Sequence, residues 1–99
     1  MKTYDEVYEM LVESLLARFR AKREDLKPTT KLKADLKLDS LDIVDLLCEI
    51  EDRYGEELVD NDDKELAKRF YTAINGTMQD TANFFLEVIN EKEKEKNNV

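Results

Sequence analysis

The chain has 99 residues, enough for one domain with a single modest core. It is 41% apolar and 40% charged, with neither an N-terminal apolar signal region nor a run long enough to span a membrane, so we expect a cytoplasmic protein without membrane insertion. Cys48 is the single cysteine and histidine is absent. This excludes an internal disulfide, Ser/His/Asp and Cys/His catalytic sets and His-containing metal sites.

The net charge of −8 is unevenly distributed. Residues 39–62 carry ten acidic side chains and one basic, whereas residues 1–38 carry nine basic and seven acidic side chains. A concentrated acidic surface repels the phosphates of nucleic acids and attracts proteins that present Lys or Arg. We therefore expect protein partners with basic patches, and no nucleic acid.

A first helix is predicted from Tyr4 to about Lys22. Thr3 and Glu6 have the spacing of a capping box, and apolar residues then recur with helical period. Basic residues gather at its end, at Arg18, Arg20, Lys22 and Arg23. The helix dipole and solubility explain these cations, although they could also meet the acidic patch of a neighbour or a partner.

Residues 24–38 form a connector with the only proline of the chain. A long connector stays disordered unless it can bury something. Because leucines are spaced along this one, we expect an ordered loop that crosses the ends of the helices; they are Leu26, Leu32, Leu36 and Leu38.

The second helix is predicted to begin at Asp39 or Ser40 and to end near Gly55. Either residue can cap the first turn, and Asp42 follows Asp39 at capping-box spacing. One face of this helix is apolar and the opposite face acidic. Between them runs a mixed stripe of Leu41, Val44 and Cys48, which a purely solvated helix would have little reason to make apolar.

Two further helices complete an all-α, small four-helix bundle, with three longer helices and an intervening third one. Residues 60–71 superficially resemble a calcium loop but lack its glycine and final glutamate, so Asp60 or Asp62 is instead predicted to cap the third helix. That helix has an apolar face of Leu66, Phe70 and Ile74 and is closed by Asn75-Gly76. The fourth begins with a Thr77/Asp80 cap, and residues 91–99 are predicted to fray as a charged tail.

The motif Asp39-Ser40-Leu41-Asp42 resembles that of the acyl carrier proteins, in which an Asp-Ser-Leu motif with a modified serine opens the second helix. The resemblance extends without a gap over residues 24–66. Two departures stand out: Lys37 occupies a position where the family usually has glycine, and residues 67–76 form an insertion that lengthens the third helix. We expect this insertion either to alter the choice of partner or to extend the core. The carrier-like domain would span residues 1–90.

The resemblance implies a carrier with no catalysis and no metal of its own. A transferase would attach 4′-phosphopantetheine from coenzyme A to Ser40, and the arm would carry acyl groups as thioesters in fatty-acid or related lipid or polyketide synthesis. The carrier would be a monomer, and acyl-handling enzymes would dock to it through Asp39, Leu41, Asp42, Val44, Asp45, Glu49 and Asp52. Two alternatives are open: a peptidyl or D-alanyl carrier with the same modified serine, and an unmodified helical adaptor that binds a basic partner.

Overall fold

The computed structural model describes residues 2–97, and within this range the regular elements are all helices, with no strand. Its elements are α1 (Tyr4–Arg18), a 3₁₀ turn η1 (Arg23–Asp25), α2 (Ser40–Tyr54), α3 (Lys64–Ile74) and α4 (Met78–Asn97). The predicted small four-helix bundle is therefore confirmed.

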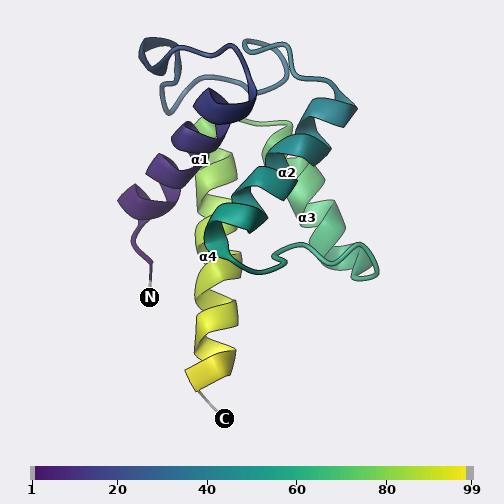
Figure 1. Ribbon diagram of the computed structural model, residues 1–99. Coiled ribbons are helices and arrows are strands. Elements are labelled where there is room, and N and C mark those ends of the chain that lie inside the picture. Colours follow the sequence, from purple (N-terminus) through teal and green to yellow (C-terminus); the bar gives the residue numbers. More distant parts are fainter. Residues whose placement is uncertain (1, 98–99) are drawn as a thin grey trace.

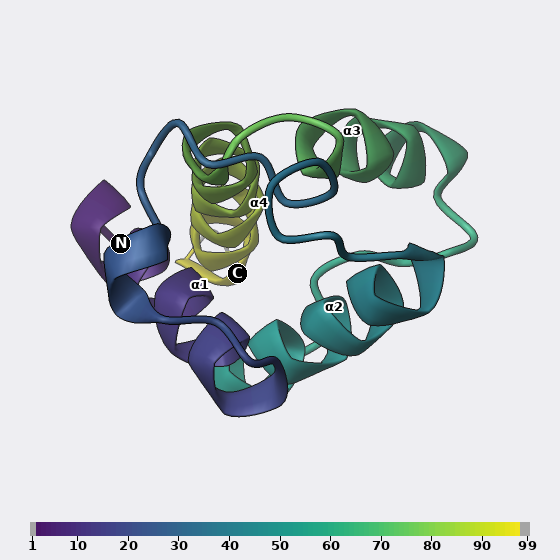
Figure 2. The ribbon, with the colours of Figure 1, turned by 90° about the horizontal axis from the view of Figure 1, so that it is seen from above.

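The longest helix, α4, runs through the middle of the bundle (Figure 1). It packs against α1 on one side and α3 on the other, and α2 packs against α1 (Figure 2). Apolar side chains of α2 and α4 are buried in the core, with Leu46 and Met78 fully inaccessible. A single core results, to which all four helices contribute.

The connector between α1 and α2 is ordered and closes one end of the bundle (Figure 2). Leu26, Leu32 and Leu38 are buried, as expected. Its backbone also serves α4, because the carbonyls of Thr30 and Pro28 accept hydrogen bonds from the N–H groups of residues 78 and 79, at 2.8 and 3.1 Å. These N–H groups have no partner within the first turn of a helix. The connector therefore caps α4 while it leads the chain to α2.

The predicted end of the first helix was wrong by four residues. The helix ends at Arg18, because Phe19 adopts an extended conformation (φ −132°, ψ 163°) and packs its ring against the core. Arg23 in η1 then pairs with Glu9 of α1 at 2.8 Å, which holds the turn against the helix. No glycine or proline lies between Arg18 and η1, so tertiary packing sets this boundary.

The third helix is capped by Asp63, which corrects the predicted Asp60 or Asp62. The Asp63 carboxylate accepts the N–H of Leu66 at 3.1 Å, while Asp60 accepts that of Asp62 in the preceding turn. Phe70 and Ile74 are buried against α4, so residues 67–74 do extend the core. That residues 67–76 are an insertion that alters partner choice remains a prediction.

Helix α4 continues through Asn97, beyond the residue at which the tail was predicted to fray. The extension has contacts of its own: the hydroxyl of Tyr54 bonds to Glu93 at 3.3 Å, and Lys96 pairs with Glu56. The last two residues of the predicted tail lie outside the described residues, and the domain boundary at residue 90 stays a prediction.

Candidate functional site

Ser40 is the first residue of α2, and Asp39 rather than Ser40 is the N-cap. The Asp39 carboxylate accepts the N–H of Asp42 at 2.9 Å, and the Asp42 carboxylate accepts the N–H of Asp39 at 3.0 Å. The predicted capping box is thus confirmed with Asp in both positions. It fixes the backbone on both sides of Ser40 and leaves the serine hydroxyl out of the cap.

Ser40 is also the more accessible of the two serines of the chain. Ser14 is fully buried in α1 and donates its hydroxyl to the carbonyl of Met10 at 2.7 Å. Ser40 is exposed, and no described residue hydrogen-bonds to its side chain. A modifying enzyme can therefore reach a serine only at the start of α2.

Lys37, three residues before Ser40, has a left-handed backbone with φ +59°. It is the only non-glycine residue with positive φ in the part of the chain that the structure describes. The backbone thus keeps, at the cost of strain, a conformation that suits glycine. Its neighbour Leu38 is buried and directs the chain into the Asp39 cap.

The mixed stripe predicted on α2 faces solvent. Leu41 is 79% exposed and Val44 50% exposed, and among residues 2–97 they and Tyr71 of α3 are the large apolar side chains that are exposed. Cys48 is exposed on the same stripe. Leu41 directly follows Ser40 and Val44 is one turn further on, so an apolar surface lies beside the exposed serine.

The predicted docking carboxylates fall into two groups. Asp39, Asp42 and Asp52 have no cation paired with them among the described residues. Asp45 and Glu49, in contrast, both contact Arg18 of α1, at 3.5 and 3.7 Å. Sequence periodicity places four of them on α2 and Asp39 at its cap, but it cannot show this contact from another helix.

Glu51 has a structural role that the sequence does not reveal. Its carboxylate accepts the backbone N–H groups of Leu58 and Val59, at 2.6 and 3.1 Å. Both of these residues are buried in the loop after α2. An acidic residue of the second helix thus holds the loop that leads to α3 in place. The spacing of Glu51 along the helix does not predict this contact.

The described residues offer no catalytic machinery around Ser40. Histidine is absent from the sequence, and no cluster of three or more metal-ligating side chains occurs within residues 2–97. Carboxylates are poor bases for an alcohol at neutral pH.

Within residues 2–97, no helix is both long and apolar enough to cross a bilayer.

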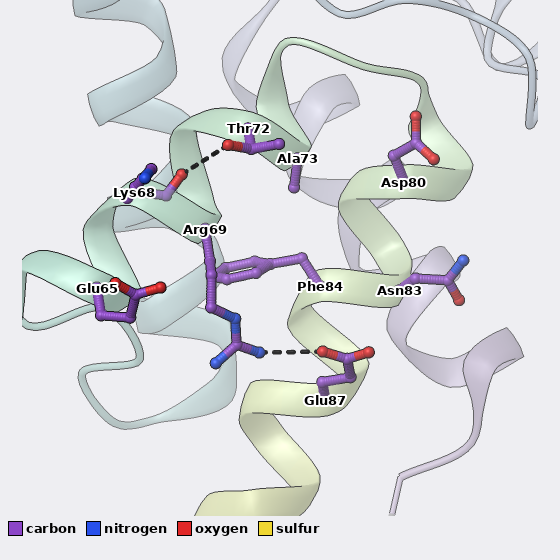
Figure 3. Close-up of a pocket in the computed structure, with 9 residues that line it drawn as sticks. All are labelled: Glu65, Lys68, Arg69, Thr72, Ala73, Asp80, Asn83, Phe84 and Glu87. Atoms are coloured by element: carbon purple, nitrogen blue, oxygen red, sulfur yellow. Dashed lines mark hydrogen bonds and ion pairs between the residues drawn. The ribbon is translucent and has the colours of Figure 1, made fainter.

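A hollow of about 540 Å³ lies between α3 and α4, away from Ser40. Figure 3 shows the side chain of Arg69 beside the ring of Phe84, with its guanidinium directed at Glu87. Arg69 and Glu87 form an ion pair at 3.0 Å. Phe84 also contacts the third helix, since the centroid of its ring lies 5.8 Å from that of Phe70. Acidic and basic side chains alternate around this hollow, which gives it no preference for a ligand of either charge.

Comparison with known proteins decides the family. The profile of the family described as "Phosphopantetheine attachment site" matches residues 10–62, the segment that contains Ser40. The acyl carrier protein of Lactobacillus johnsonii is 30% identical over 64 residues, which cover 65% of this chain and 80% of that protein. The chain belongs to the acyl carrier protein family. The acyl carrier protein of Chloroherpeton thalassium is 28% identical over 85 residues, covering 86% and 95% of the two chains. No solved structure gave a significant match.

Acyl carrier proteins are carriers rather than catalysts, and their family has a covalently attached 4′-phosphopantetheine group. The start of α2 fits such a group. The helix dipole and the free N–H groups of the first turn favour a phosphodiester there, by typically ~0.3–1 kcal/mol at an exposed site. Asp39 and Asp42 oppose it by like charge. A covalent bond does not depend on this balance, so accessibility of the hydroxyl is the condition that matters, and Ser40 meets it.

Proposed function

We propose that Ser40 is the attachment point of 4′-phosphopantetheine, and that the chain carries acyl intermediates between enzymes of fatty-acid or related lipid or polyketide synthesis. One observation carries this assignment: within the matched segment, Ser40 is the exposed serine, fixed by the capping box at the first position of α2. The group supplies a terminal thiol on which acyl cargo is held as a thioester. The chain itself supplies position and recognition.

The attachment needs an enzyme, because Ser40 has no base among its neighbours. The serine oxygen attacks the phosphorus of coenzyme A that carries pantetheine, and the bond from this phosphorus to the bridging oxygen breaks. Adenosine 3′,5′-bisphosphate leaves with the bridging oxygen, and the serine proton passes to a base of the transferase. A single P–O bond forms as one breaks, so neither an oxidant nor a reductant is required.

Recognition by the transferase and by acyl-handling enzymes is proposed to use the accessible side of α2. The exposed Leu41 and Val44 lie beside the serine, and carboxylates flank them. A basic partner would be steered by this charge and released readily, as a carrier requires, because exposed charge pairs are weak and screened by salt. The proposed surface consists of Asp39, Leu41, Asp42, Val44, Asp45, Glu49 and Asp52.

We also propose a monomeric carrier in the cytoplasm, with no nucleic acid partner. A peptidyl or D-alanyl carrier would share the modified serine and differ in cargo. An unmodified adaptor would use the same acidic surface but would not need the hydroxyl of Ser40. The carrier is favoured over the adaptor because the matched family is defined by the attachment site itself.

The test is intact-mass analysis after incubation with coenzyme A and a broad-specificity phosphopantetheinyl transferase. The wild type should gain one phosphopantetheinyl group, and Ser40→Ala should gain none. This variant should remain folded, because the helix cap belongs to Asp39 rather than to Ser40. Its circular dichroism should therefore match that of the wild type.

Ser14→Ala is the matched control, since it removes the only other serine and should leave the mass gain intact. Cys48→Ser should also gain the group, and its newly alkylatable thiol must then belong to the arm because Cys48 is the only cysteine. An unmodified wild type, beside a control carrier that is modified, would instead favour the adaptor.

A further inference from the structure

Arg18 lies over the centre of the acidic face of α2, although it belongs to the last turn of α1. Its guanidinium reaches Asp45 Oδ1 at 3.5 Å and Glu49 Oε1 at 3.7 Å. Arg18 and Asp45 are both accessible, with side chains 46% and 61% exposed. The chain thus places one of its own cations where a basic partner is proposed to bind.

The two carboxylates under Arg18 differ in how firmly they are held. Glu49 is only 19% exposed, and its second oxygen accepts a hydrogen bond from Arg53 Nε at 2.8 Å. Both of its oxygens are therefore engaged within the chain. Asp45 has Arg18 as its single cationic neighbour among the described residues. Asp45 can exchange this partner, whereas Glu49 serves mainly to hold the two arginines.

We propose that Arg18 is an intramolecular competitor for docking: it occupies Asp45 in the free carrier and yields this carboxylate to a Lys or Arg of the partner enzyme. The inference rests on the proposed function and deepens it. Asp39, Asp42 and Asp52 are not paired with a cation among the described residues. A partner therefore contacts these carboxylates first and then displaces Arg18 from Asp45. The exchange replaces one cation by another and leaves no charge unpaired.

An exposed ion pair contributes little, so this competition must be weak and quickly reversed. Weak competition suits a carrier that must leave each enzyme in turn. The competition also makes docking selective. A protein with one basic residue on its surface would bind α2 more weakly than a partner whose basic residues both replace Arg18 and bind the flanking carboxylates.

The experiment compares Arg18→Gln with Lys22→Gln in the transferase reaction. Both variants lose one positive charge, but Lys22 is exposed beyond the end of α1 and has no ion pair with a described residue. Arg18→Gln should raise kcat/KM for modification by about two- to fivefold at low salt, the range expected for one exposed ion pair. The gain should lie in KM, and it should shrink at about 0.15 M salt. Lys22→Gln should give a smaller gain, through net charge alone.

A double-mutant cycle with Asp45→Asn assigns the effect to the pair. In the Asp45→Asn background, Arg18→Gln should give no more than Lys22→Gln does. Equal effects of the two charge variants, or a lower kcat/KM for Arg18→Gln, would overturn the competition while the modified wild type still supported the proposed function. An unmodified wild type would overturn both. Thermal unfolding of each variant separates loss of docking from loss of fold.

Discussion

At the scale of single residues, Lys37 has a backbone conformation that is unfavourable for a residue with a side chain. A left-handed conformation brings the Cβ of an L-residue close to the following carbonyl, at a cost of about 1–2 kcal/mol. Lys37 adopts it at φ +59°, and its side chain is exposed. Lys37→Gly should therefore stabilise the fold by about 0.5–1 kcal/mol, after the larger entropy of an unfolded glycine is subtracted. Urea unfolding measures the change through a shifted midpoint at constant slope.

Lys33→Gly is the matched control in the same connector. Lys33 is exposed and has no positive φ, so glycine brings only its entropy and should destabilise by roughly 0.5–1 kcal/mol. The two Lys→Gly changes should thus have opposite signs. The same sign for both would show that Lys37 is not strained in solution.

The candidate site could be predicted where it depends on spacing along one helix. The Asp39/Asp42 box follows from local pattern and was confirmed, with Ser40 as the first residue of α2. The same pattern gives the apolar stripe of Leu41 and Val44, whose exposure is known only from the structure. The ion pair between Arg18 and Asp45 could not be predicted, since it depends on how α1 and α2 pack. The sequence also contains a signal that Ser14 is less accessible than Ser40, because Ser14 lies on the apolar stripe of its helix.

At the scale of elements, one carboxylate determines how α2 is joined to the loop before α3. Glu51 accepts two backbone N–H groups of buried residues, Leu58 and Val59. Glu51→Ala would leave these donors without an acceptor, and hydrogen bonds to a charged group contribute about 1.5–3 kcal/mol. We expect a loss of stability of this size, measured by urea unfolding. Amide exchange should accelerate at residues 58 and 59.

Asp52→Ala provides the comparison on the next residue of the same helix. Asp52 is exposed and without a cationic partner among the described residues, so its loss should change stability by no more than about 0.5 kcal/mol. Equal effects at the two positions would mean that the general acidity of α2, rather than the bonds of Glu51, controls stability.

The elements themselves were predicted well, and their boundaries less so. The start of α1 and both ends of α2 follow from capping residues and Gly55, whose φ is +96°. The end of α1 depends instead on the packing of Phe19. The length of α4 depends on the contacts of Glu93 with Tyr54, the last residue of α2, and of Lys96 with Glu56, just after it. Local signals therefore fix an element end only where the cap is local.

At the scale of the whole molecule, acidic and basic residues are concentrated in different segments of the chain, and the fold brings only some of them into ion pairs. The surplus of carboxylates in residues 39–62 is met from outside this segment by Arg18 and Lys96. The sequence has no histidine, the side chain whose ordinary pKa lies nearest to neutral pH. The stability of the fold should consequently be nearly level around neutral pH and change at the acid and alkaline ends.

The acid end can be assigned to particular groups. Hydrogen bonds from the backbone and side chain of Thr3 lower the pKa of Glu6, and the hydrogen bond from Arg23 lowers the pKa of Glu9. A carboxyl whose pKa is lower in the folded state adds stability that is complete above its unfolded pKa of about 4.3 and is lost as pH falls through the folded value. Glu6→Gln should therefore be less stable than the wild type at neutral pH, and the two should converge below pH ~4.

Thr3→Ala removes the hydroxyl of the same capping box but keeps the backbone N–H of residue 3, which is the larger cause of the lowered pKa of Glu6, so it should reduce the acid-dependent part of stability less than Glu6→Gln does. At the alkaline end, burial raises the pKa of Tyr4, Tyr8 and Tyr54, so their contribution is complete at neutral pH and is lost only as pH rises through these raised values. Unfolding free energies across the pH range test both ends. A gap between wild type and Glu6→Gln that persisted unchanged in acid would show that Glu6 stabilises α1 by packing or helix propensity rather than through its charge.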